Sequence, residues 1–272
     1  MKFVCPKCAS ALFVDENGSA KCKQNHTYDR ARAGYYNLML SAGAGTHGDN
    51  LEMVEARRAF LDTGAYSPLA KRVSDIVFDL ATAGSTSVLD IGCGEGYYTD
   101  IIERKLSAGG ASSCVCGFDI SRDAIKRAAK RNKNIELAVA GAYHMPTSDE
   151  SFDIAVNMFS PLVPAEILRT LKPHGYFVMA IPGENHLFEL KEKAYKTPYK
   201  NDVADSHIDG FRLVSNEKIS YEISLDKNRD IRSLFMMTPY AYRTSPQDKA
   251  RVLAMEKLKC RVEFVVFVYK KV

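Results

Sequence analysis

The 272-residue sequence has no long apolar run, no secretory signal and no strong charge bias. Its longest apolar runs, such as FVVFVY at residues 264–269, are far shorter than the ~20 residues needed to cross a bilayer. The N-terminus MKFVCPKC lacks the apolar stretch of a secretory signal. The net charge of +4 does not by itself demand a polyanionic partner. We therefore expect a protein without membrane association, located in the cytoplasm.

Proline and glycine are not in excess, while 46% of residues are apolar and 26% are charged. This composition is typical of a globular protein with a sizeable core, and the length allows one large domain plus a small appendage. Disulfides are not expected in a reducing cytoplasm. Four of the seven cysteines fall in apolar surroundings and are therefore expected to be small buried hydrophobic residues. They are Cys93, Cys114, Cys116 and Cys260.

The other cysteines form a candidate metal site. Cys5, Cys8, Cys22 and His26 have the spacing C-x2-C-x13-C-x3-H. Three thiolates and one imidazole complete a tetrahedral zinc site and leave no open position for catalysis. We expect one structural zinc ion per chain, which supplies the folding free energy of a unit too small to fold alone. Two short strands joined at Asn17-Gly18 are expected between the ligand pairs. The alternative is a set of reduced cysteines without metal.

A loop and two helices are predicted to follow. Residues 41–50 (SAGAGTHGDN) show no periodicity and indicate a loop. The apolar spacing of residues 51–64 predicts a helix that Asp49 or Asn50 caps and Gly64 ends. A second helix is predicted with Ser67 as its cap and Pro68 in its first turn.

A glycine-rich turn is the strongest chemical signal in the rest of the chain. The apolar run Val88–Ile91 leads into the turn Gly92-Cys93-Gly94-Glu95-Gly96, and a helix is predicted from Tyr97. Such a turn lets a ligand approach the backbone at the carboxyl end of a parallel strand. Asp90 and Glu95 would repel a pyrophosphate but suit the cationic amino-acid end of S-adenosylmethionine (SAM). Asp119 ends the next strand, where it could accept hydrogen bonds from ribose hydroxyls. A nucleotide-binding Rossmann domain and a purely structural turn are the alternatives.

Strands and helices alternate along the remaining sequence. A helix that Ser121 caps, strands at 135–140 and 152–161, a helix at 164–175 that ends at Gly175 and a strand at 176–183 are expected. The late stretches 218–225 and 260–269 could form an antiparallel pair at the sheet edge, with a helix from Ser245-Pro246 between them. The predicted fold class is α/β, a Rossmann-like seven-stranded SAM-dependent methyltransferase domain preceded by a small N-terminal zinc ribbon.

The segment NMFSPL at residues 157–162 lies at the end of the fourth predicted strand. Enzymes that methylate exocyclic amines commonly have Asn/Asp-Pro-Pro-aromatic at this point, and this sequence departs from that pattern. Phe159 could stack on a base at the strand end, or it could be a packed core aromatic.

Several segments together resemble the 23S rRNA (guanine-N1-)-methyltransferases of the RlmA type. They are CPKC, CKQNH, GYYNL, GDNLEMVEARRAFLDTGAYSPL, VLDIGCGEGYYTD, PGENHLFELKEKAY and MTPYAYR. The resemblance extends along nearly the whole chain. It implies a homodimeric enzyme that methylates N1 of one guanine in a domain II hairpin of 23S rRNA, with a zinc unit that helps to recognise RNA. It also implies cofactor contacts from Gly94, Glu95, Tyr66 and His186.

One segment departs from the family. After GYYNL the family is often basic, whereas MLSAGAGTHG is nearly uncharged here, so phosphate contacts from this loop are in doubt. Basic residues of the zinc unit remain available to face RNA phosphate. They are Lys7, Lys21, Lys23 and Arg30.

The sequence therefore predicts three parts: a zinc-binding RNA-recognition domain at 1–36, a linker and helix at 37–64, and a SAM-dependent methyltransferase domain at 65–272. The proposed cofactor contacts are Tyr66, Asp90, Gly92, Gly94, Glu95, Gly96, Asp119 and His186. Removal of the guanine N1 proton calls for a general base, which the sequence does not identify; His144 and His186 are candidates. The rival functions are a small-molecule methyltransferase with a structural zinc ribbon and a non-catalytic RNA-binding module.

Overall fold

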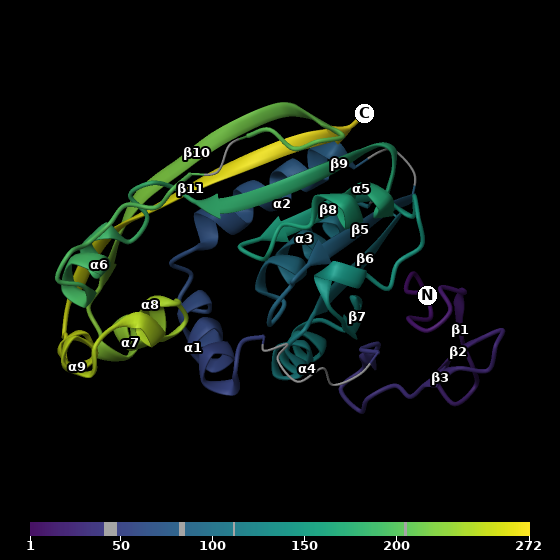
Figure 1. Cartoon of the computed structure of the whole chain (residues 1–272), viewed down its shortest axis with the longest axis horizontal. Helices are drawn as coiled ribbons and strands as arrows, with labels where there is room; N and C mark the ends of the chain where they lie inside the picture. The colour runs from purple at the N-terminus through teal and green to yellow at the C-terminus, as the bar shows by residue number, and fades with distance from the viewer. Residues whose placement is uncertain (41–47, 82–84, 111, 204–205) are drawn as a thin grey trace.

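The computed structural model describes residues 1–40, 48–81, 85–110, 112–203 and 206–272. Within them, a small three-stranded sheet near the N-terminus lies beside one large mixed sheet with flanking helices (Figure 1). The loop predicted at residues 41–50 falls mostly outside the described residues. None of the described helices is long and apolar enough to span a membrane.

The large sheet has eight strands in the described part of the chain. Their spatial order is β10 (Phe211–Leu225), β11 (Leu258–Lys271), β9 (Leu171–Pro182), β8 (Phe152–Met158), β5 (Ser85–Ile91), β6 (Ser112–Asp119), β7 (Glu136–Val139) and β4 (Tyr36–Asn37). The strands from β4 to β9 are parallel, whereas β11 runs antiparallel to both β9 and β10. The predicted Rossmann-like arrangement and its antiparallel edge pair are confirmed, with β4 as an additional strand. The chain order reverses at β5, where open α/β sheets bind ligands.

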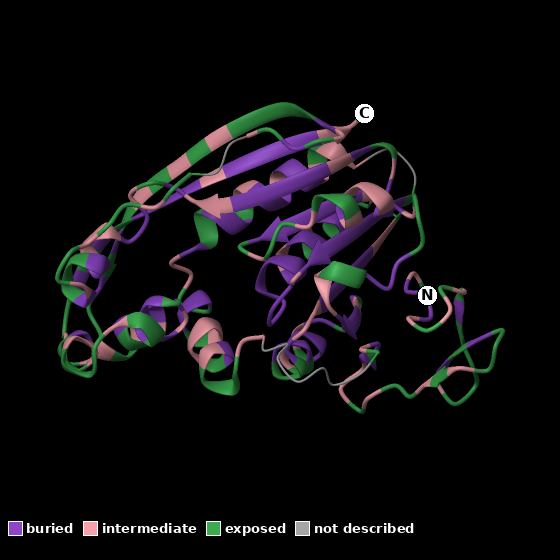
Figure 2. Ribbon diagram, viewed as in Figure 1, coloured by how far each residue is buried: buried purple, intermediate pink, exposed green. Residues whose placement is uncertain are grey.

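Alternate residues of each central strand enter different cores, as the two-residue period of a strand requires. Val88 packs into a core shared with α2 (Ser67–Leu80), α3 (Tyr97–Ala108) and α4 (Arg122–Arg131). Leu89 packs instead with α5 (Pro164–Thr170) and with N-terminal residues such as Phe3. Figure 2 shows the central strands buried between these layers. The N-terminal unit thus contributes to the cover of one sheet face.

The remaining helices gather near the end of the β10–β11 pair that lies away from the N-terminus (Figure 1). They are α1 (Leu51–Leu61), α6 (Phe188–Ala194), α7 (Asn228–Met236), α8 (Tyr240–Arg243) and α9 (Pro246–Leu253). Two predicted caps are confirmed, because the side chains of Asn50 and Ser121 each accept a backbone N–H at the start of α1 and α4. Ser245 caps α9 in the same way.

Helix α1 ends at Leu61, with Asp62 as its C-cap, rather than at the predicted Gly64. Two further predicted helix boundaries are wrong. Ser67 is the first residue of α2 and not its cap; Tyr66 occupies the cap position without a side-chain capping bond. Helix α5 ends at Thr170 rather than Gly175, and β9 begins at Leu171. Pro173 explains the second difference, because a proline disfavours the helical conformation of the residue before it.

The N-terminal unit contains β1 (Leu12–Val14), β2 (Ala20–Cys22) and β3 (Thr27–Tyr28), and β1 and β2 form the predicted hairpin. It is anchored to the large domain at two places. At the first, Phe3 bridges to Thr147, and the Val4 N–H donates to the Pro146 carbonyl at 2.8 Å. At the second, β4 pairs with β7 and so adds an edge strand to the large sheet.

Candidate active site and metal centre

The four predicted zinc ligands lie together. Nδ1 of His26 is 3.4 Å from Sγ of Cys5 and 3.5 Å from Sγ of Cys22, and Sγ of Cys8 is 3.6 Å from Sγ of Cys22. Tetrahedral zinc with Zn–S of about 2.3 Å and Zn–N of about 2.0 Å places ligand sulfurs roughly 3.8 Å apart, and sulfur and nitrogen roughly 3.5 Å apart. The residues therefore fit a closed zinc site.

Two tight turns bring the ligands together. The Ala9 N–H donates to the Cys5 carbonyl at 2.8 Å, and the Asn25 N–H donates to the Cys22 carbonyl at 2.9 Å. Ala9 and Asn25 both adopt positive φ, as the chain must after each turn.

The other cysteines lie outside the zinc site. Cys93, Cys116 and Cys260 are buried as predicted, whereas Cys114 is only half-buried.

A cavity of about 1650 Å³ opens at the carboxyl ends of β5, β6 and β8. Seven of the eight predicted cofactor residues line it, while Gly96 does not. Val4, Cys5, Pro6 and Ala9 of the N-terminal unit also line it. The cavity therefore connects the zinc ribbon with the glycine-rich turn.

The three glycines of the turn have different structural roles. All have positive φ: +71° at Gly92, +57° at Gly94 and +84° at Gly96. A Cβ at Gly92 would lie 2.5 Å from Cβ of Ser160, and one at Gly96 would lie 2.9 Å from Cβ of Ala128. A Cβ at Gly94 would meet nothing within 4 Å. Gly92 and Gly96 are thus needed for packing, while Gly94 leaves the backbone open to a ligand.

Two buried carboxylates of the cavity each have an oxygen without a partner. Oδ2 of Asp90 accepts a hydrogen bond from the Thr99 hydroxyl at 2.6 Å, and Oε2 of Glu95 accepts from Nη2 of Arg131 at 2.6 Å. Oδ1 of Asp90 and Oε1 of Glu95 have no hydrogen-bond partner. Burial raises the pKa of Asp90 to about 7 and raises that of Glu95 from its ordinary value. A cationic ligand would satisfy both oxygens, which fits the ammonium group of SAM.

Arg131 is a site residue that the sequence pattern does not signal. It also forms an ion pair with Asp62 at 2.8 Å, and its guanidinium lies over the Tyr97 ring. Arg131 therefore occupies Oε2 of Glu95, and only Oε1 is left to contact a ligand. Nothing in the helical pattern around Arg131 signals this pairing, because the two residues are 36 positions apart.

Asp119 holds the glycine-rich turn in place. Its Oδ2 accepts the Gly94 N–H at 3.0 Å, and its Oδ1 accepts the Ser121 N–H at 2.7 Å. Each carboxylate oxygen keeps a second lone pair. Asp119 can therefore still accept hydroxyl hydrogen bonds at the cavity, in addition to its two backbone bonds, which the sequence does not indicate.

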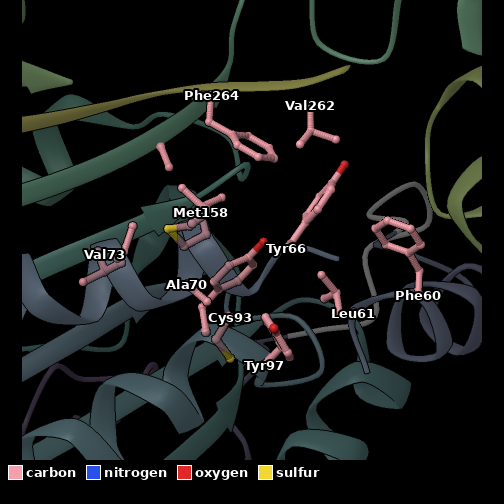
Figure 3. Packing of buried hydrophobic residues seen from close by; sticks show 14 of the residues in the cluster. Phe60, Leu61, Tyr66, Ala70, Val73, Cys93, Tyr97, Met158, Val262 and Phe264 are labelled. Carbon is pink, nitrogen blue, oxygen red and sulfur yellow. The ribbon is translucent and has the colours of Figure 1, made fainter. Parts of the chain in front are cut away.

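Tyr66 and His186 also line the cavity, and their side chains meet there. The Tyr66 hydroxyl is 3.2 Å from Nε2 of His186, and both side chains are buried. Figure 3 shows the Tyr66 ring between Phe60 and Phe264, and it meets each of them edge-on with centroids 5.0 Å apart. Burial lowers the pKa of His186 to about 3, so its ring is neutral near pH 7.

Phe159 has an unusual backbone conformation for a large residue. Its φ is +61° and its side chain is 40% exposed, so it is not a packed core residue. A non-glycine residue in this region costs about 1–3 kcal/mol and commonly marks a functional site. Asn157, at the end of β8, accepts the Ser160 N–H and donates to the Pro161 carbonyl, each at 3.2 Å. These bonds fix the turn that presents Phe159 to the cavity.

Two family models match this chain. The methyltransferase domain model covers residues 83–232, and the RlmA N-terminal zinc ribbon model covers residues 3–40. Among solved structures, YcgJ of Bacillus subtilis is 14% identical with a TM-score of 0.48, over 74% of this chain and 98% of that one.

Two curated relatives match over most of their length. The 23S rRNA (guanine(748)-N(1))-methyltransferase of Streptomyces fradiae is 31% identical over 92% of this chain and 89% of that protein. A Bacillus subtilis (strain 168) protein named "Putative 23S rRNA (guanine-N(1)-)-methyltransferase YxjB" is 29% identical over 92% and 90%. This chain therefore belongs to the 23S rRNA (guanine-N1-)-methyltransferase family, with an N-terminal zinc ribbon of the RlmA type.

Proposed function

We propose that this protein is an enzyme that transfers the methyl group of SAM to N1 of a specific guanine in a domain II hairpin of 23S rRNA. The observation that carries the proposal is the shared cavity, because residues of the zinc ribbon and of the glycine-rich turn line the same space. Family membership supports the substrate class.

The residues suggest separate tasks. Asp90 and Glu95 would hold the ammonium group, Asp119 the ribose hydroxyls, and the open backbone at Gly94 would admit the cofactor. SAM would supply an electrophilic methyl group: the N1–carbon bond would form as the carbon–sulfur bond breaks, S-adenosylhomocysteine would leave as a neutral thioether, and the N1 proton would pass to water. The protein mainly positions the acceptor for this in-line displacement. Zinc would stay outside the chemistry because its site is closed.

His186 does not suit the role of general base. The Glu263 backbone N–H donates to its Nδ1 at 3.2 Å, and its Nε2 faces the Tyr66 hydroxyl. Both ring nitrogens are therefore engaged, and burial opposes protonation. We assign His186 to positioning, together with Tyr66, at the proposed cofactor site.

The zinc ribbon supplies the proposed RNA-binding surface. Lys7, Lys21, Lys23 and Arg30 are all exposed. Phe13, which is 57% exposed, lies directly opposite Lys21 in the β1–β2 pair. Exposed aromatic rings beside lysines can bind unpaired bases and phosphates together.

We also propose the division into residues 1–36, 37–64 and 65–272, although β4 lies across the first boundary.

The activity can be tested with labelled SAM and either 23S rRNA or a pool of small molecules. We expect label in the rRNA and a primer-extension stop at one guanine, because an N1 methyl group blocks Watson–Crick pairing. Turnover of a small acceptor without any RNA labelling would support a small-molecule methyltransferase instead. Gly94→Asp serves as the control without cofactor binding.

The RNA surface can be tested by charge reversal. The Lys21→Glu/Lys23→Glu double variant should bind the hairpin more weakly and reduce the salt dependence by about one unit of slope per lost phosphate contact. Lys257→Glu is the control, since Lys257 is exposed and lies in the segment between α9 and β11. Figure 1 shows α9 at the opposite end of the molecule from the ribbon. Equal effects of the two exchanges would refute the assignment.

The proposed homodimer should appear in light scattering as twice the chain mass. The proposed cytoplasmic location can be checked by cell fractionation.

A further inference from the structure

Phe159 and Tyr98 lie side by side at the cavity, and the proposed cofactor site does not use either of them. Tyr98 is in the first turn of α3, directly after the glycine-rich turn, and Phe159 follows β8. Their rings meet edge-on with centroids 6.1 Å apart, and both residues line the cavity.

The Phe159 ring is fixed on one side and open on the other. It contacts Phe264, which is fully buried, with centroids 5.6 Å apart. The Phe159 N–H donates to the Ala180 carbonyl at 3.2 Å, which holds the backbone despite its positive φ. The side chain is nevertheless 40% exposed. A rigid, partly exposed aromatic ring in a cavity provides a stacking surface for a planar ligand.

The Tyr98 hydroxyl has no hydrogen-bond partner although the side chain is only 9% exposed. A buried hydroxyl without a partner destabilises the free protein, so its retention requires an explanation. A neutral phenol can donate to an oxygen atom of a ligand. Burial keeps the pKa of Tyr98 well above its ordinary value, so the hydroxyl retains its proton.

The position suits the methyl acceptor. Ser160, the residue after Phe159, donates to the Ile91 carbonyl at 2.6 Å, which joins the Phe159 turn to the end of β5. The acceptor must lie within about 3–3.5 Å of the methyl carbon, and so beside the glycine-rich turn. When guanine loses its N1 proton, the negative charge is shared between N1 and O6. A hydrogen-bond donor at O6 would stabilise that charge.

We propose that Phe159 and Tyr98 form the subsite for the target guanine, in which Phe159 stacks on the base and the Tyr98 hydroxyl donates to O6. This assignment rests on the proposed function, since it takes guanine as the acceptor. It adds the residues that bind the base and that stabilise the charge next to N1.

The test uses the full-length, zinc-loaded protein, the rRNA hairpin that the wild type methylates, and two conservative exchanges. Phe159→Leu keeps apolar bulk but removes the aromatic face, and should lower kcat/KM for RNA roughly 5- to 150-fold, the range that base stacking on an aromatic ring commonly gives. Tyr98→Phe should lower kcat on the order of 100-fold. SAM affinity, measured by calorimetry, should stay within about threefold for both. Tyr176→Phe, at a half-buried tyrosine that does not line the cavity, is the matched control.

A second readout separates function from structure. Tyr98→Phe should have an unfolding temperature equal to or above that of the wild type, because it removes a buried hydroxyl without a partner. A lower unfolding temperature would indicate a structural hydroxyl and would overturn its assignment. Loss of SAM affinity in Tyr98→Phe would assign the hydroxyl to the cofactor. Unchanged RNA methylation in both variants would refute the subsite, whereas the absence of RNA methylation by the wild type would refute the proposed function and the subsite with it.

Discussion

The Tyr66 hydroxyl and Nε2 of His186 lie 3.2 Å apart although 120 residues separate them in the sequence. Because the Glu263 N–H donates to Nδ1, the neutral His186 ring carries its proton on Nε2. Nε2 then donates to the Tyr66 oxygen, which leaves the Tyr66 proton free to face the cavity. His186 thus makes Tyr66 a hydrogen-bond donor.

His186 should also influence stability at low pH. Its pKa is about 3 in the folded state and about 6.5 in an unfolded chain, so the unfolded state binds the additional proton between these values. The His186 contribution is complete above pH 6.5 and declines as pH falls toward 3. His186→Gln should remove this decline in urea unfolding measured at pH 4, 5, 6 and 7.5. The same decline in wild type and variant would contradict a buried neutral His186.

Asp90 should act in the opposite direction. Its pKa is about 7 in the folded protein and about 3.9 when unfolded, so the folded state retains the proton longer. Its contribution to stability is present below pH 4 and is lost as pH rises to 7. Asp90→Asn should therefore be more stable than wild type at pH 8, by on the order of 2–4 kcal/mol, and should bind SAM more weakly. Wild-type SAM affinity should fall as pH drops below 7; a flat profile from pH 6 to 8 would argue against contact with a cation.

The three glycines of the turn should respond differently to substitution. Gly94→Asp should abolish SAM binding and lower stability by only about 1 kcal/mol, because space is open at that position and aspartate tolerates a positive φ better than most residues. Gly92→Ala and Gly96→Ala should each lose about 1–3 kcal/mol of stability, since the new Cβ would lie under 3.0 Å from Ser160 or Ala128. Calorimetry and thermal unfolding separate the two effects. An unfolded Gly94→Asp with a stable Gly96→Ala would reverse this interpretation.

Removal of zinc should affect the ribbon most. Chelation, or Cys8→Ser, should take the metal content from one ion per chain to none and expose residues 1–30 to hydrogen exchange and proteolysis. SAM affinity should change little, because Asp90, Gly94 and Glu95 lie on the large domain, whereas RNA methylation should be lost. A metal-free protein with a protected ribbon would rule out the structural role.

The zinc ligands and the glycine-rich turn could be predicted because their signals are local. Cys5 and Cys8 share one turn, Cys22 and His26 share another, and their spacing reflects the geometry of the metal. Asp90 and Asp119 could be placed together because neighbouring parallel strands end at the same edge of a sheet.

The long-range pairings could not be predicted from periodicity. Glu95 meets Arg131, and Tyr66 meets His186, only because the strands between them bring distant segments together. A helical or strand pattern shows which face is apolar but does not show its partner. The exposure of Phe159 cannot be predicted for the same reason, since a short apolar segment has one pattern whether it faces a core or a cavity.

The pairing of β4 with β7 has a consequence for the order of folding. Tyr36 pairs with Ala138, so the docking strand is synthesised about a hundred residues before the strand that receives it. Contacts of such high sequence separation form late, so β4 remains unpaired while the ribosome synthesises the chain up to β7. During that interval zinc can keep the β1–β2 hairpin folded, because metal binding does not depend on the large sheet. Zinc supply during translation should then set how much of the newly made enzyme docks its ribbon correctly.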